Sequence, residues 1–120
     1  MLKTIRAFKY ALQGFRYAFL EERNFRIEIF CAVVVITLGI IFKLTSIEWF
    51  IVVLNMSIVL FAELFNTAIE KLADVSSKEI NPTIKIVKDV AAAAVVVSVI
   101  CAFVCGLIIF IPIIYNSFLQ

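Results

Sequence analysis

The chain has 120 residues, of which 64% are hydrophobic and 17% charged, and its formal net charge is +2. A soluble domain of this length could not hide so much apolar surface, because soluble proteins rarely expose apolar patches larger than about a few hundred Å². The surroundings are therefore expected to be lipid, and the small net charge gives no reason to expect a nucleic-acid partner. A bilayer core about 30 Å thick takes roughly 20 apolar helical residues per crossing, so residues 1–120 allow three crossings in one domain.

The first predicted element is an amphipathic helix over residues 2–22. Its apolar residues recur every three or four positions, which places them on one face of a helix; they are Leu2, Ile5, Phe8, Leu12, Phe15 and Phe19. Basic residues lie between them, namely Lys3, Arg6, Lys9 and Arg16. An apolar stripe opposite a basic face is typical of a helix that lies in the membrane interface. A helix packed on a soluble core is the alternative, but this composition supplies no such core.

Three predicted transmembrane spans follow the amphipathic helix. The first covers about residues 25–43, and the second runs from 47 to 74, with Trp49 near its start as an interfacial anchor. A loop that ends at Pro82 precedes the third span, residues 87–112, and the chain beyond it is expected to bend or to emerge at the far surface. The predicted fold class is an all-α membrane protein with an N-terminal interfacial helix and three transmembrane helices.

The distribution of basic residues predicts the orientation of these spans. Residues 1–28 contain six Lys or Arg and residues 71–88 contain four, whereas the first turn contains only Lys43 and the tail contains none. Loops rich in Lys and Arg stay in the cytoplasm. We therefore expect a multi-pass membrane protein with a cytoplasmic N-terminus. Because three helices enclose almost no interior, a homo-oligomer is also expected.

A polar face is predicted at the cytoplasmic end of the second span. At 100° per residue, Glu63, Asn66, Glu70 and Asp74 fall within an arc of about 80°, and Glu70 lies about 10 Å beyond Glu63 along the axis. A lone acid such as Glu63 could be a snorkelling or lysine-paired residue, but a whole face of oxygen ligands favours Mg²⁺. Lys88, expected nearby, could bind a phosphate. The residues alone predict a metal-dependent site that a lipid headgroup can reach.

Three motifs allow a more specific prediction, because together they resemble one known family. Glu63-Leu-Phe-Asn-Thr-Ala-Ile-Glu70 with Asp74, Lys88-Asp-Val-Ala-Ala, and Glu22-Arg-Asn-Phe-Arg26 are similar to the signature of the prokaryotic diacylglycerol kinase and undecaprenol kinase family. The resemblance implies a homotrimer with sites shared between subunits that transfers the γ-phosphate of ATP to a membrane lipid alcohol. The motifs favour undecaprenol as the acceptor, with diacylglycerol as the alternative.

The resemblance also implies roles for individual residues. Glu63 takes the position of the general base, and Asn66 helps to position the reacting groups. Glu22 and Glu70 take the positions of Mg²⁺ ligands, and Arg26, Glu28 and Glu63 those of contacts to the acceptor. The implied nucleotide contacts are Lys88 and Asp89, with weaker matches at Tyr10, Glu79 and Asn81. Two residues depart from the undecaprenol kinase pattern: Glu28 where a histidine is common, and Ala93 where a glycine is common.

Two other classes of protein compete with a lipid kinase. An acid within a small multispan chain is also typical of a proton-coupled transporter. A transporter would need its acid near the bilayer midplane, whereas Glu63 is expected at the cytoplasmic edge. A non-catalytic membrane subunit would leave the face of carboxylates unexplained.

Overall fold

The computed structural model describes residues 1–76 and 79–120, and the described part of the chain is all-helical, as predicted. The helices are α1 (Leu2–Glu21), α2 (Arg23–Ile41), α3 (Ser46–Ser76) and α4 (Pro82–Phe118). Of these, α2, α3 and α4 are long and apolar enough to cross a membrane. The chain is therefore a multi-pass membrane protein with three candidate spans.

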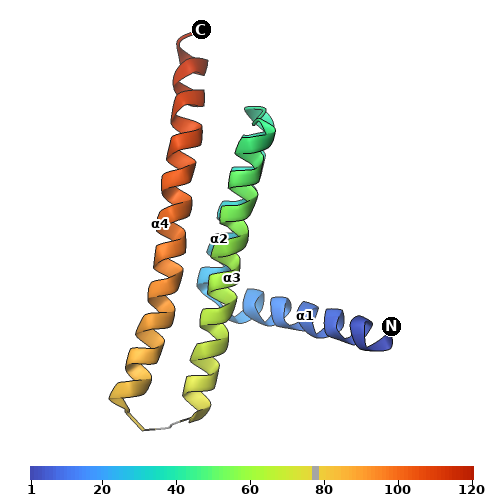
Figure 1. Cartoon of the computed structure of the whole chain (residues 1–120), viewed down its shortest axis with the longest axis vertical. Coiled ribbons are helices and arrows are strands. Elements are labelled where there is room, and N and C mark those ends of the chain that lie inside the picture. The colour runs from blue at the N-terminus through green and yellow to red at the C-terminus, as the bar shows by residue number, and fades with distance from the viewer. Residues whose placement is uncertain (77–78) are drawn as a thin grey trace.

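The three long helices run side by side, and α1 lies crosswise to them (Figure 1). α3 packs against α4 on one side and α2 on the other, and α1 joins the bundle through its end next to α2. At their connected ends, α3 and α4 continue past the level of α1 (Figure 1). Polar residues on these last turns therefore lie beyond the plane in which α1 runs.

The two longest helices extend further than the sequence indicated. α3 has 31 residues and α4 has 37, so α4 is about 55 Å long at 1.5 Å per residue. α4 also continues through Pro112 as far as Phe118, whereas the third span was predicted to end at this proline. In lipid the backbone groups around a proline have no water as an alternative partner, which keeps the flanking turns helical. α4 starts at Pro82, earlier than the predicted residue 87, because Asn81 caps its first turn.

The corner between α2 and α3 is a tightly hydrogen-bonded turn. Lys43 adopts the left-handed conformation, with φ of 54°, and the N–H of Leu44 donates to the carbonyl of Gly39 at 3.1 Å. This pattern closes the C-termini of many helices. A capping box then starts α3, because the Thr45 N–H donates to Glu48 Oε2 at 2.9 Å and the Glu48 N–H donates to Thr45 Oγ1 at 3.3 Å. The corner thereby gives Glu48 a structural role.

Trp49 packs into the same corner and limits the size of its neighbour. A Cβ atom added to Gly39 would lie 2.7 Å from Trp49 Cη2 and 3.0 Å from Leu44 Cδ1. Next to this contact, Leu44, Val52 and Ile109 form a small apolar cluster that joins the corner to α4. The close approach at Gly39 therefore fixes α2 against α3 at the end of the bundle farthest from α1.

Burial in this chain is the reverse of that in a soluble domain. Large apolar side chains such as Phe30, Phe61 and Ile100 are exposed, whereas Glu63 and Asn66 are buried. Exposed apolar groups are favourable in hydrocarbon, and buried polar groups in soluble and membrane proteins alike need partners. The fold therefore presents apolar groups to lipid and gathers a few polar ones inside.

Candidate active site

The break between α1 and α2 fixes the position of Glu22. This residue has an extended backbone, with φ of −108° and ψ of 109°, between two helices. Arg26 Nη1 donates to the carbonyl oxygens of Phe19 and Leu20, both at 2.9 Å, and so closes the end of α1. Phe25, only 2% exposed, anchors the corner. Arg26, predicted to contact the acceptor, thus has a structural role at the corner.

One face of α3 carries buried polar side chains at the level of this corner. Glu63 is 2% exposed, Asn66 8% and Thr67 6%. Thr67 Oγ1 donates to the carbonyl oxygen of Glu63 at 3.0 Å. Within the described part of the chain, Glu63 Oε2 and Asn66 Oδ1 have no hydrogen-bond partner. Both atoms are acceptors, so this buried face is suited to a hydroxyl group or a cation.

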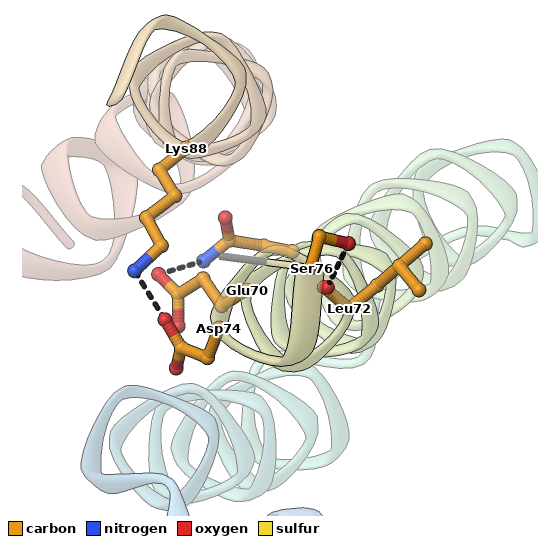
Figure 2. Close-up of polar contacts among 6 residues, drawn as sticks. Glu70, Leu72, Asp74, Ser76 and Lys88 are labelled. Atoms are coloured by element: carbon orange, nitrogen blue, oxygen red, sulfur yellow. Dashed lines mark hydrogen bonds and ion pairs between the residues drawn. The ribbon is translucent and has the colours of Figure 1, made fainter. Parts of the chain in front are cut away.

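The polar face continues along α3 and reaches α4. Asn66 Nδ2 donates to Glu70 Oε1 at 3.3 Å, and Asp74 forms an ion pair with Lys88 of α4. Figure 2 shows Glu70, Asp74 and Lys88 turned toward one another between the two helices. The structure therefore brings Lys88 to the same face as the predicted metal ligand Glu70.

Carboxylates from two helices and a corner meet around Glu63. Glu63 is close enough to Glu22 and Glu70, and also to Glu28, for their charges to interact. Glu28 Oε2 is a further buried oxygen without a partner among the described residues. Neighbouring carboxylates repel one another unless a cation or a proton neutralises them. This cluster therefore favours a bound cation or a proton.

An apolar groove ends at the acidic cluster. It has a volume of about 560 Å³ and lies between α2, α3 and α4. Asn24 and Glu28 line one end, while Ile109 and Ile114 line the other, and most of the remaining lining is apolar. A linear hydrocarbon chain could therefore lie along the helices with its polar end beside Glu28.

The other predicted nucleotide contacts lie apart from this cluster. Asp89 is exposed and pairs with Lys85 at 2.7 Å on the same helix. Tyr10 is 65% exposed in the middle of α1, the helix that lies crosswise to the bundle. Asn81 Oδ1 accepts from the N–H of Thr83 at 2.9 Å and caps α4. Glu79 is exposed beside residues 77 and 78, which lie outside the described part of the chain.

The structure adds two residues that the sequence reasoning missed. Lys71 of α3 places its Nζ atom 5.5 Å from the centroid of the Tyr17 ring on α1, a cation–π contact. Helical periodicity could not pair residues so far apart in the chain. The available signal was the position of Lys71 itself, a basic residue between Glu70 and Asp74 on an otherwise acidic segment.

The oxygen atoms of this face suit Mg²⁺ in kind, although they form no closed cage. Among the described residues, no group of three or more His, Cys, Asp or Glu side chains could hold a metal ion by itself. Mg²⁺ usually takes one or two carboxylates and completes its coordination with water and substrate phosphates. Glu22 and Glu70, both half-buried near Glu63, match that requirement, provided that a phosphate compound supplies the remaining ligands.

Comparison with known proteins agrees with this geometry. Residues 9–110 match the family model described as prokaryotic diacylglycerol kinase. The chain is 37% identical over 107 residues to a diacylglycerol kinase of Synechocystis sp., covering 88% of this chain and 61% of that protein. It is 36% identical over 110 residues to the undecaprenol kinase of Bacillus subtilis, covering 92% and 89% respectively. A diacylglycerol kinase of Helicobacter pylori is 31% identical over 98 residues, covering 82% and 77%. The chain thus spans about three fifths of the Synechocystis protein and most of the other two. It belongs to the prokaryotic diacylglycerol kinase family, a family of membrane lipid kinases.

Proposed function

We propose that this protein transfers the γ-phosphate of Mg-ATP to undecaprenol, with diacylglycerol as the alternative acceptor. The observation that carries the proposal is Glu63, an almost completely buried carboxylate with an unpaired oxygen. Glu63 lies beside Glu28, where the apolar groove ends. An alcohol at the end of a hydrocarbon chain could therefore approach Glu63 directly from the lipid.

Glu63 acts as the general base in this proposal. Its unpaired Oε2 accepts the proton of the acceptor hydroxyl, whose oxygen then attacks the γ-phosphorus of ATP and displaces ADP. Asn66 donates to Glu70 through Nδ2 and keeps Oδ1 unpaired, so it can orient the acceptor hydroxyl. Catalysis of phosphoryl transfer depends mainly on positioning and charge neutralisation, which so few side chains could supply.

Glu22 and Glu70 would hold Mg²⁺, which neutralises charge on the phosphates when it is bound. Lys88 would bind a phosphate of the nucleotide, and for this it must exchange Asp74 for the phosphate. Glu28 and Arg26 would contact the headgroup end of the acceptor. The motifs that resemble the undecaprenol kinase pattern, Glu22 to Arg26 and Lys88 to Asp89, favour the polyisoprenoid acceptor.

The working unit in this proposal is a homotrimer of the bacterial inner membrane, with α1 in the interface and the N-terminus in the cytoplasm. The crosswise direction of α1 and its alternating apolar and basic residues support its interfacial position. Tyr10 is exposed on α1, the helix that lies crosswise to the bundle (Figure 1). A site shared between subunits would let Tyr10 contact nucleotide that is bound by a neighbouring copy.

A competition assay tests the choice of acceptor. Purified protein receives Mg-ATP with undecaprenol and diacylglycerol together in mixed micelles, and both phosphorylated products are quantified. We expect a higher kcat/KM for undecaprenol. A clear preference for diacylglycerol would contradict undecaprenol as the acceptor but would agree with a lipid kinase. Phosphorylation of neither lipid would contradict the proposed reaction.

A further inference from the structure

Lys71 is a charged residue beside the acidic face, and the proposed reaction gives it no role. Its ammonium group lies over the ring of Tyr17, and its charge interacts with those of Glu22 and Asp74. Tyr17 is 42% exposed, so the contact lies at the surface of the corner. The contact joins α1 directly to α3, the helix that carries Glu63 and Glu70.

The position of Glu22 depends on how α1 is held. Because Glu22 is the extended residue between two helices, a change in the direction of α1 redirects its side chain. Arg26 bonds the end of α1 to the start of α2, which fixes the corner internally. The Tyr17–Lys71 contact instead fixes α1 relative to α3, and hence Glu22 relative to the carboxylates across from it.

We propose that Lys71 is a positioning residue that holds α1 through the Tyr17 ring and thereby places the Glu22 carboxylate against Glu63 and Glu70. Lys71 touches neither reactant in this account. The inference rests on the proposed function for the role of Glu22 as a metal ligand. The contact itself, however, can be tested without any enzyme activity.

The direction in which the Mg²⁺ requirement changes distinguishes a positioning role of Lys71 from a purely electrostatic one. Removing a cation near carboxylates strengthens their attraction for Mg²⁺, so a purely electrostatic Lys71 predicts that Lys71→Met needs less Mg²⁺. A positioning Lys71 predicts the opposite. We expect the half-saturating Mg²⁺ concentration to rise about two- to five-fold in Lys71→Met and in Tyr17→Leu, the size typical of one exposed cation–π contact. The turnover at saturating Mg²⁺ should remain within about two-fold of that of the unmodified protein.

A conservative variant and a second measurement complete the experiment. Lys71→Arg keeps a cation over the Tyr17 ring and should behave like the unmodified protein. Lys3→Met removes the same charge from the exposed far end of α1 and is the matched control. Hydrogen exchange of the α1 amides in micelles should become about two- to five-fold faster in Lys71→Met and Tyr17→Leu, and should not change in Lys71→Arg and Lys3→Met.

Each outcome decides between these accounts. A lower Mg²⁺ requirement in Lys71→Met, or unchanged α1 exchange in both disruptive variants, would overturn the inference. An equal rise in Lys3→Met would do the same, since the effect would then not depend on the contact between Tyr17 and Lys71. If Lys71→Met does not fold, Tyr17→Leu gives the same test with the charge retained. Absence of activity in the unmodified protein would contradict the proposed function, while hydrogen exchange would still test the contact.

Discussion

Replacing Glu63 with glutamine should separate the activity of this protein from its stability. The side chain is 2% exposed, one of its oxygens is unpaired, and three carboxylates lie near it. Loss of general-base assistance reduces turnover by about 10²–10⁴-fold, which corresponds to a rise of about 3–5 kcal/mol in the activation barrier. An unsatisfied buried polar group costs about 1–3 kcal/mol. Glutamine is neutral, so it removes the repulsion between Glu63 and the three nearby carboxylates. The fold should therefore become about 1 kcal/mol more stable, at the lower end of this range.

The assay combines turnover with thermal unfolding in the same detergent at one scan rate. Glu48→Gln is the matched control, because it makes the same chemical change in the capping box at the start of α3. The control should keep its turnover and lose about 0.5–1 kcal/mol of stability, as expected for a weakened cap. Near-normal turnover of Glu63→Gln would refute the general-base role. A lower Tm for Glu63→Gln would show instead that the buried acid stabilises the fold.

Three further predictions test the metal, the corner and the orientation. Glu70→Gln should raise the Mg²⁺ concentration needed for half-maximal activity, with activity partly restored at high Mg²⁺, and an unchanged Mg²⁺ titration would contradict its role as a ligand. Gly39→Ala should lower stability in thermal unfolding by about 1–3 kcal/mol, the usual cost of overpacking, because the new Cβ would lie 2.7 Å from Trp49. An unchanged Tm would show that the side chains of the corner can rearrange to accept the methyl group. In intact cells, with the native cysteines replaced, Ser117→Cys should react with an impermeant thiol reagent and Ser76→Cys should not. The reverse pattern would invert the topology.

The helices were predictable because each depends on local sequence. The alternation of apolar and basic residues in α1 and the long apolar segments after it need no knowledge of distant contacts. The same applies to the shared face of Glu63, Asn66 and Glu70, which follows from helical geometry alone. The Schellman turn at Lys43 was not predicted, because a lysine gives no sequence signal for a left-handed conformation, which is usually adopted by glycine.

Contacts between helices were harder to predict. The cation–π contact between Tyr17 and Lys71 and the ion pair between Asp74 and Lys88 depend on the relative rotation of neighbouring helices. The relative rotation of neighbouring helices cannot be derived from a single sequence. Asp89 was assigned to the nucleotide because of the family resemblance, and this role stays a prediction; in the structure Asp89 pairs with Lys85 on an exposed surface of α4.

Because α3 is uninterrupted, the depth of the proposed site depends on the thickness of the membrane. Trp49 near one end is expected to lie at the membrane interface, and Glu63 lies about 21 Å from it along the helix at 1.5 Å per residue. α3 has no break between Trp49 and Glu63, so the distance between these two residues is fixed. The depth of the Glu63 carboxylate in the membrane therefore follows from the position of Trp49. In a thicker bilayer the helix must tilt less or draw Glu63 deeper into hydrocarbon, each at a modest energetic cost. Lipid chain length would then regulate how easily an acceptor alcohol and a water-soluble nucleotide meet at the same carboxylate.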